Sequence, residues 1–363
     1  MKLNELDTPV LLIDQDALGH NLNAMKEIVS NSGITYRPHA KAHKSHDIAK
    51  LQLAHGASGI CCAKLGEAEV LASEGIQDIL ITTPVIGLSK VSRLASLAKK
   101  TSVIVVADNP QNLEELALVG EKTGQIFNLV IEVNVGQNRC GTPPGAPALA
   151  LAQMIQRSPW LKLCGLQGYQ GSIQMRESFT ERKTEAQKAS FLLRETAKLI
   201  ESNGINVPSL TGGGTGTSLI DSEANLLTEI QPGGYIFMDV KYRKIEWSNS
   251  TPLPFQQSLT VLGSVISLPD TNRAILDVGL KSISSDQGPP ELMDMPGITF
   301  RFSGEEHGEV SWQDSPRLCQ YGDKVRLIPT HCDTTVNLYD QYIVHSGNTV
   351  VDVWRISARG RSQ

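Results

Sequence analysis

The run Val10-Leu11-Leu12-Ile13, followed by Asp14, begins the pattern that decides the fold class. Four apolar residues predict a buried strand, and aspartate is a residue type that caps the start of a helix. The apolar residues that follow recur near the helical period, at Leu18, Leu22, Met25, Ile28 and Val29. A strand followed by a helix is the repeating unit of α/β folds.

Further units of this kind follow along the first two thirds of the chain. Strands are predicted at Ile34–Arg37, Gly59–Cys62, Ile79–Thr82, Val103–Val106, Leu129–Val133, Leu163–Gln167 and Ser209–Thr211. Helical segments lie between most of them, for example at residues 66–73, 112–123 and 180–202. About eight units in about 230 residues predict a (β/α)8 TIM-type barrel. An open doubly wound sheet is the alternative, but no GxGxxG follows the first strand, which weakens its dinucleotide-binding version.

The pattern changes after Tyr242. The segment Asn249–Pro254 is polar and contains prolines, which is typical of a boundary. Short strands without helical patterns are predicted beyond it, at Leu259–Ile266, Arg273–Val278, Ile298–Phe302, Lys324–Ile328, Tyr342–His345 and Thr349–Trp354. We therefore predict a barrel at residues 7–242 and a C-terminal β domain at residues 250–363, joined by the N-terminal residues 1–6.

Composition excludes several classes of protein. The 363 residues are 40% hydrophobic and 20% charged, which is typical of a folded chain. Lys and Arg number 33 against 38 Asp and Glu, a net charge of −5 without a strongly basic block, so we expect no nucleic-acid surface. No apolar run approaches the ~18–20 residues that span a bilayer, and residues 1–9 lack the apolar centre of a signal peptide. We therefore expect a cytoplasmic protein without a membrane segment, whose six cysteines are reduced.

The densest polar cluster is Arg37-Pro-His-Ala-Lys-Ala-His-Lys-Ser-His46, directly after the second predicted strand. Strand ends of a barrel carry its catalytic groups, so Lys41 is placed to project over the barrel mouth. Cationic neighbours at Arg37 and Lys44 would lower the pKa of Lys41 and favour a neutral, nucleophilic amine. A solvated basic loop is the simpler interpretation of this segment taken alone.

Two glycine-rich segments follow near the end of the barrel series. Residues 211–217 read Thr-Gly-Gly-Gly-Thr-Gly-Thr, and residues 231–235 read Gln-Pro-Gly-Gly-Tyr. Consecutive glycines let backbone N–H groups approach an anion, and barrels often bind phosphate at the loops after their last two strands. The position and the threonines favour a phosphate site over a merely flexible loop.

The β domain contains Pro329-Thr-His-Cys-Asp333 near its end. In an extended segment His331 and Asp333 would point the same way, with Cys332 turned away. An imidazole and a carboxylate suit Mn²⁺, Zn²⁺ or a similar ion, whereas His331 with Cys332 would favour zinc. A structural hydrogen bond between the histidine and the aspartate is the alternative without a metal.

A lysine after an early strand, a phosphate loop and a β domain together fit pyridoxal phosphate, which needs an amine, a phosphate cradle and a partner for its ring nitrogen. The sequence resembles the D-threonine aldolase group of alanine-racemase-type (fold type III) pyridoxal-phosphate enzymes nearly from end to end. The segments that carry the resemblance are residues 7–9, 37–44, 59–69, 135–141, 165–171, 212–217, 231–239, 277–281, 306–308, 329–337 and 357–360. The chain departs from the family pattern at two places. It has Ser285-Asp286-Gln287-Gly288 where relatives have Asp-Ser-Gly, and Asp239-Val240-Lys241-Tyr242 where close relatives have an acidic residue and then Tyr.

The resemblance implies a role for each matching residue. It makes Lys41 the Schiff-base lysine and places Arg139 near the phenolic oxygen of the cofactor. Gln231 lies where alanine racemases carry an arginine facing the pyridine nitrogen, and Tyr169 is a further cofactor contact. The residues expected to hold the phosphate are Thr215, Gly216, Gly234 and Tyr235. The metal pair maps onto His331 and Asp333, with Mn²⁺ as the first expectation and Mg²⁺, Zn²⁺ or Co²⁺ as alternatives.

The activity implied by the resemblance is the metal-dependent retro-aldol cleavage of a β-hydroxy-D-amino acid. D-threonine would give glycine and acetaldehyde, and 3-hydroxyaspartate would give glycine and glyoxylate. A metal-bound water, His39 or His43 would act as the base, and a homodimer is expected. The alternatives are a dehydratase that yields a keto acid and ammonia, or a non-enzymatic pyridoxal-phosphate carrier. Dehydratases of this group show His-x-Cys where this chain has His-Cys-Asp, and the carriers lack the β domain.

Overall fold

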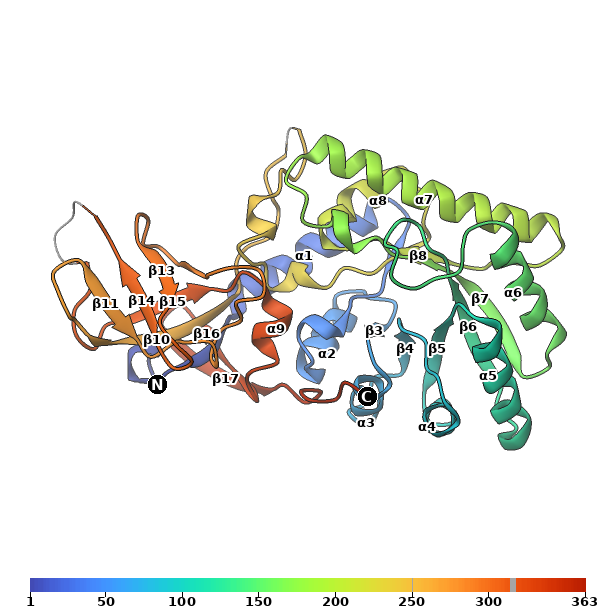
Figure 1. Cartoon of the computed structure of the whole chain (residues 1–363), viewed down its shortest axis with the longest axis horizontal. Helices are drawn as coiled ribbons and strands as arrows, with labels where there is room; N and C mark the ends of the chain where they lie inside the picture. Colours follow the sequence, from blue (N-terminus) through green and yellow to red (C-terminus); the bar gives the residue numbers. More distant parts are fainter. Residues whose placement is uncertain (250, 314–317) are drawn as a thin grey trace.

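The structure is a computed structural model that describes residues 1–249, 251–313 and 318–363. It consists of two sheets side by side: a parallel sheet wrapped in helices, and a mixed sheet formed mainly by the C-terminal third of the chain (Figure 1). The predicted boundary segment Asn249–Pro254 lies between them in sequence, and its Ser250 is outside the described residues.

Eight strands among the described residues form the parallel sheet, in the order β2-β9-β8-β7-β6-β5-β4-β3. Their bounds are β2 Thr35–Tyr36, β3 Ile60–Cys62, β4 Asp78–Ile81, β5 Ser102–Ala107, β6 Phe127–Glu132, β7 Leu161–Gly168, β8 Leu210–Gly212 and β9 Glu229–Ile230. A parallel bridge between His39 and Cys61 joins the two end strands, and the amide of Cys61 donates to the Pro38 carbonyl at 2.8 Å. The sheet therefore curls into a barrel, and the predicted fold class is confirmed.

Helices cover the outside of the barrel. Their bounds are α1 Gln15–Ser30, α2 His46–Ala54, α3 Leu65–Ser73, α4 Leu88–Ala98, α5 Pro110–Thr123, α6 Ala146–Arg157, α7 Phe179–Ser202 and α8 Ser218–Ala224. Local chemistry sets their ends: the Asn109 side chain accepts from the amide of Gln111 at the start of α5, and Gly124 ends that helix in the left-handed conformation.

The second sheet is mixed. Its strands are β1 Val10–Asp14, β10 Leu259–Ser267, β11 Arg273–Leu276, β12 Glu291–Leu292, β13 Thr299–Phe302, β14 Gly308–Ser311, β15 Lys324–Ile328, β16 Gln341–Ser346 and β17 Thr349–Arg355. One short helix, α9 Cys332–Val336, follows β15. Short 3-10 turns complete the described elements: η1 Leu3–Glu5, η2 Ala40–Ala42, η3 Gly171–Ile173, η4 Thr215–Thr217, η5 Gly234–Ile236 and η6 Tyr242–Lys244.

The expectation that Val10–Ile13 is the first barrel strand was wrong. β1 lies in the mixed sheet, antiparallel to β10 and parallel to β16. Leu11, Leu12 and Ile13 are buried, and an apolar run of this kind suits the centre of either sheet. The barrel therefore begins at β2, and its eighth strand is β9, which the sequence pattern did not reveal.

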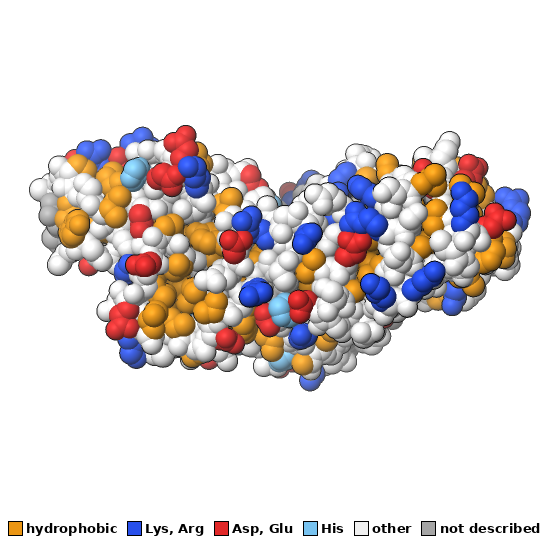
Figure 2. Space-filling view, turned by 90° about the horizontal axis from the view of Figure 1, so that it is seen from below, with side chains coloured by type: hydrophobic (Ala, Val, Ile, Leu, Met, Phe, Trp, Pro, Cys, Tyr) orange, Lys and Arg blue, Asp and Glu red, His pale blue; other side chains and the backbone are white. Residues whose placement is uncertain are grey.

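The surface carries no large field of one charge in the view of Figure 2, where Lys and Arg mix with Asp and Glu over the barrel side. Apolar side chains gather on the β-domain side of the same face. Of the helices in the described part of the chain, none has the length and apolar character needed to span a membrane.

Candidate active site

Lys41 lies in η2, directly after β2, and its side chain is 43% exposed at the barrel mouth. The short helix α9 of the β domain packs against η2. This packing brings the Lys41 ammonium into an ion pair with the carboxylate of Asp333. The barrel lysine and one of the two predicted metal ligands therefore meet at a single place.

The predicted electrostatics of Lys41 were wrong. Asp333 is the largest influence and raises the pKa of Lys41 above its ordinary value, against the lowering effect of burial. The expected cationic neighbours are neutralised by carboxylates of their own. Arg37 donates to Glu229 at 3.1 Å and to Asp78 at 2.6 Å, and Lys44 forms a buried ion pair with Glu67. A basic sequence motif thus folds into separate ion pairs.

Both predicted base histidines are neutral and tied into the loop around Lys41. The Nδ1 of His39 accepts from the Lys41 amide at 3.3 Å. Its Nε2 lies 3.0 Å from the Oγ1 of Thr82, which itself donates to a backbone carbonyl, so Nε2 carries the proton. Burial lowers the pKa of His39 well below its ordinary value and that of His43 to about 4. The Nδ1 of His43 accepts from the Ser45 amide at 3.1 Å.

The sequence pattern predicted an extended segment around the metal pair, and this prediction was wrong. His331 is the N-cap of α9 and Asp333 lies in its first turn, while the buried Cys332 thiol donates to the Met238 carbonyl at 3.0 Å. Burial raises the pKa of Asp333, but Lys41 and His331 together bring it below its ordinary value. Asp333 is therefore a carboxylate, as a metal ligand must be.

An acidic partner orients His331. The Nδ1 of His331 lies 2.6 Å from the Oδ2 of Asp286, and the hydroxyls of Ser284 and Thr334 donate to the other oxygen of Asp286 at 2.8 and 3.0 Å. Fixing Nδ1 in this way leaves Nε2 as the nitrogen that can bind a cation. Sequence reasoning noted Asp286 only as a departure from the family pattern, because its contact with His331 spans 45 residues.

The predicted phosphate residues come together from the loops after β8 and β9. The amide of Tyr235 donates to the Oγ1 of Thr215 at 3.1 Å, and the amide of Gly216 donates to the side-chain oxygen of Gln174 at 3.0 Å. The loop needs glycine at position 216, since a Cβ there would lie 1.8 Å from the Gln174 carbonyl oxygen. Both amides donate to protein oxygens here; backbone donors of this kind at the start of a short helical turn are the groups that would cradle an anion.

The positions of two tyrosine side chains, Tyr235 and Tyr242, differ from the prediction. The ring of Tyr235 is buried and its hydroxyl accepts from the Gln52 side-chain amide at 3.2 Å, so its phenol already has a partner in the protein. The phenol near the cradle belongs to Tyr242: its ring lies 2.8 Å from where a Cβ of Gly234 would stand, and it hydrogen-bonds Thr215. Sequence reasoning missed this role because Tyr242 lies beyond the glycine motif.

The remaining predicted cofactor contacts lie at the same barrel mouth. The Arg139 guanidinium stands over the Tyr169 ring, 5.9 Å from its centre. Burial raises the pKa of Tyr169, while Lys41 and Arg139 oppose that rise, so the phenol is near both cations. Gln231 donates to Gln167 at 3.1 Å and to Thr211 at 2.9 Å, which holds its amide inside the barrel.

These residues fit pyridoxal phosphate and a divalent cation. The Lys41 amine and the glycine-rich loop around Gly216 both lie at the mouth of the barrel. Beside the amine, His331 and Asp333 supply an imidazole and a carboxylate. The fit is one of chemistry and position: the amine and the anion-binding amides lie on loops that follow different barrel strands.

The comparisons with known proteins agree with this geometry. The family model described as "Alanine racemase, N-terminal domain" matches residues 13–241, and the one described as "Putative serine dehydratase domain" matches residues 258–345. A D-threonine aldolase of Arthrobacter sp is 40% identical, with 99% of this chain and 95% of that protein covered.

The chain belongs to the D-threonine aldolase family.

A 3-hydroxy-D-aspartate aldolase of Paracoccus denitrificans is 35% identical over 99% of this chain and 94% of its own length. The crystal structure of D-threonine aldolase from Filomicrobium marinum matches with a TM-score of 0.96 and 33% identity, covering 99% of this chain and 98% of the other. The prediction of an aldolase-type carbon–carbon lyase is thus confirmed at the level of the family.

A more distant relative shares the architecture. The D-threo-3-hydroxyaspartate dehydratase of a Delftia strain is 26% identical, with 96% of this chain and 97% of that enzyme covered. A solved structure of a variant of a D-threo-3-hydroxyaspartate dehydratase matches with a TM-score of 0.87, 26% identity and 98% coverage of each chain, and is described as being in the metal-free form.

Proposed function

We propose that this member of the D-threonine aldolase family cleaves β-hydroxy-D-amino acids of the D-threonine or D-3-hydroxyaspartate type to glycine and an aldehyde, using pyridoxal phosphate and a divalent metal. The observation that carries this proposal is the contact between Lys41 and Asp333. It sets the amine that would hold the cofactor against the carboxylate that would hold the metal. A substrate seated there meets both groups at once.

The chain holds each group with its own residues. Lys41 would bind the cofactor covalently, the cradle around Thr215 and Gly216 its phosphate, and Arg139 its phenolic oxygen; His331 and Asp333 would bind the metal, with Mn²⁺ as the first choice. When bound, pyridoxal phosphate supplies an electron sink for the bond that breaks, and the metal lowers the pKa of the substrate hydroxyl.

The protein's own side chains set the charges and the histidine tautomer around this site. Asp333 forms an ion pair with the Lys41 ammonium and raises the pKa of Lys41 above its ordinary value. Asp286 fixes the tautomer of His331. Of the two predicted bases, His39 lies nearer the chemistry, because it bonds the Lys41 amide and interacts with both Lys41 and Asp333. His43 is buried, its Nδ1 accepts from the Ser45 amide, and the Tyr342 hydroxyl donates to its carbonyl at 2.6 Å.

A dehydratase is the main alternative. It would use the same lysine, cofactor and metal but release a keto acid and ammonia. Three observations favour the aldolase: the 40% and 35% identity to two aldolases against 26% to the dehydratase, the carboxylate at position 333, and the burial of the Cys332 thiol, which donates to the Met238 carbonyl.

Product analysis tests the proposal. Purified protein loaded with pyridoxal phosphate and Mn²⁺ is incubated with D-threonine, D-3-hydroxyaspartate or L-threonine, and the products are identified by NMR. We expect glycine with acetaldehyde or glyoxylate from the D substrates and little turnover of L-threonine. A keto acid with ammonia would contradict the proposal and indicate a dehydratase.

Variants separate an enzyme from a cofactor carrier. Lys41→Ala should lose the cofactor absorbance on gel filtration together with all turnover, whereas Lys50→Ala, which alters an exposed lysine of α2, should keep both. Wild-type protein that retains the cofactor but turns over none of these substrates would instead indicate the non-enzymatic carrier.

A further inference from the structure

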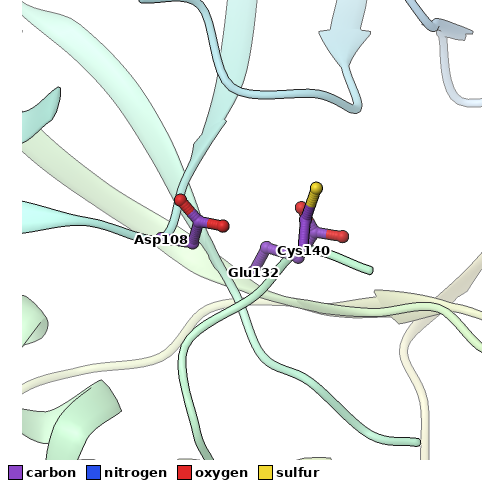
Figure 3. A group of neighbouring side chains, drawn as sticks. All are labelled: Asp108, Glu132 and Cys140. Carbon is purple, nitrogen blue, oxygen red and sulfur yellow. The ribbon is translucent and has the colours of Figure 1, made fainter. Parts of the chain in front are cut away.

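Three chemically reactive side chains meet on the barrel mouth away from Lys41. Asp108 follows β5 directly, Glu132 ends β6, and Cys140 lies on the loop that leaves β6. One ligand atom from each lies within 4.8 Å of the others (Figure 3). The sheet explains this meeting: β5 and β6 are parallel neighbours with Ala107 opposite Ile131, so the next residue of each strand ends at the same edge.

The loop is folded back to complete the cluster. Val133 and Thr142 form a parallel bridge, which returns the segment with Cys140 to the end of β6. The amide of Gly141 donates to the Oδ2 of Asp108 at 2.8 Å. That bond holds one carboxylate oxygen in place and leaves the other free to bind.

Glu132 gives an independent sign of a missing ligand. Its side chain is buried, with 6% exposure, and among the described residues its Oε2 has no hydrogen-bond partner. A buried carboxylate oxygen without a donor is costly, and native structures usually satisfy it with a partner or an ion. In Figure 3 this carboxylate lies beside Cys140, and Asp108 reaches toward both from the neighbouring strand.

We propose that Asp108, Glu132 and Cys140 form a binding site for a divalent cation of the zinc class. Two carboxylates and a thiolate combine hard and soft ligands, the mixture that Zn²⁺ accepts, and three protein ligands leave the fourth tetrahedral position to water. Binding releases the thiol proton, because only the thiolate is a ligand. Burial raises the pKa of the Cys140 thiol, and Arg139 and Lys64 lie near enough to oppose that rise and so favour the thiolate.

The site differs from the pair at His331 and Asp333 in position and ligands. It joins two barrel strands to the loop that carries Arg139, the residue next to Cys140. A cation there ties the Arg139 loop to the barrel and so positions the guanidinium over Tyr169. The role is structural and does not depend on which substrate the enzyme cleaves.

Cobalt(II) is a suitable probe, because its bonds to thiolate give an intense near-ultraviolet absorption that oxygen and nitrogen ligands do not. The holoenzyme is titrated with Co²⁺ after chelator treatment and its spectrum compared with that of the enzyme without metal. We expect a thiolate band in the wild type and in Cys164→Ser, a matched control at another partly exposed thiol. Cys140→Ser should lose the band, and Glu132→Gln should weaken Co²⁺ binding by more than the roughly 10- to 100-fold typical of an outer-shell change.

A variant at the other pair separates the two sites. His331→Ala should keep the thiolate band, with circular dichroism confirming that each variant is folded. The proposal would be overturned if the wild type lacked the band, if Cys140→Ser kept it, or if His331→Ala lost it. Loss in His331→Ala would indicate that Cys332 is the thiolate ligand.

Discussion

Lys41 and Asp333 are 292 residues apart in sequence and form an ion pair at the mouth of the barrel. Their contact depends on α9 of the β domain packing against η2 of the barrel. Segments associated with the two sheets therefore meet at this point.

Asp333→Asn should lower the pKa of Lys41. The carboxylate is the largest cause of the raised pKa, so removing its charge leaves burial, which favours the neutral amine. The pH dependence of pyridoxal phosphate attachment to the apoenzyme, followed by absorbance, should then move to lower pH. Asp340→Asn, at an exposed carboxylate paired with Arg359, is the control and should leave the profile unchanged. An unshifted profile in Asp333→Asn would show that the ion pair does not govern Lys41.

Asp286→Ala should weaken metal binding at His331. Asp286 is hydrogen-bonded to the Nδ1 of His331 at 2.6 Å, and losing an outer-shell carboxylate costs about 10- to 100-fold in metal affinity. Titration with Mn²⁺ measures the effect. The matched control is Asp294→Ala, which removes an exposed partner of Arg326. Equal Mn²⁺ affinities in the two variants would show that Asp286 does not support metal binding.

Gly216→Ala should impair cofactor binding. The new Cβ would lie 1.8 Å from the backbone oxygen of Gln174, so the cradle must shift. Overpacking of this kind costs about 1–3 kcal/mol, which corresponds to a loss of about 5- to 150-fold in pyridoxal phosphate affinity. Gly19→Ala in α1, where no atom lies within 4 Å of the new Cβ, should keep the affinity and gain about 0.5–1 kcal/mol of stability. Full cofactor affinity in Gly216→Ala would place the phosphate elsewhere.

Asp221→Asn should flatten the dependence of stability on pH. Asp221 is buried in α8, and burial raises its pKa from 3.8 to about 7. Because the folded pKa exceeds the unfolded one, Asp221 lowers stability progressively as pH rises from about 4 to about 7. This difference in pKa between the unfolded and folded states bounds the effect at about 4 kcal/mol. Thermal unfolding at pH 8 should therefore occur at higher temperature in Asp221→Asn than in the wild type, and the difference should shrink at pH 5. The same difference at both pH values would contradict the raised pKa.

The barrel and most strands could be predicted from sequence because apolar runs and helical periods are local signals. The run of β15 was predicted at Lys324–Ile328 and found there. Local signals could not assign β1 to a sheet, since its burial is equally compatible with both. Nor could they find β9, whose two residues are too short to show a period.

The structure brings the predicted residues Lys41 and Asp333 together, but the predicted electrostatics of Lys41 were wrong. Lys41, Thr215 and Asp333 were named from motifs, but the charge on Lys41 is set by the distant Asp333 rather than by its neighbours in the motif. Asp286 and the cluster of Asp108, Glu132 and Cys140 join residues from separate segments, so only the folded chain shows them.

The most direct test of the central claim is glycine formation from D-threonine by the pyridoxal phosphate-loaded enzyme, measured after EDTA treatment and again after Mn²⁺ is added. We predict that EDTA abolishes glycine formation, that Mn²⁺ restores it in the wild type, and that Asp333→Ala remains inactive with Mn²⁺ while retaining its cofactor absorbance. Glycine formation that survives EDTA, or an Asp333→Ala variant that Mn²⁺ fully restores, would contradict the assignment of one shared site to Lys41 and Asp333.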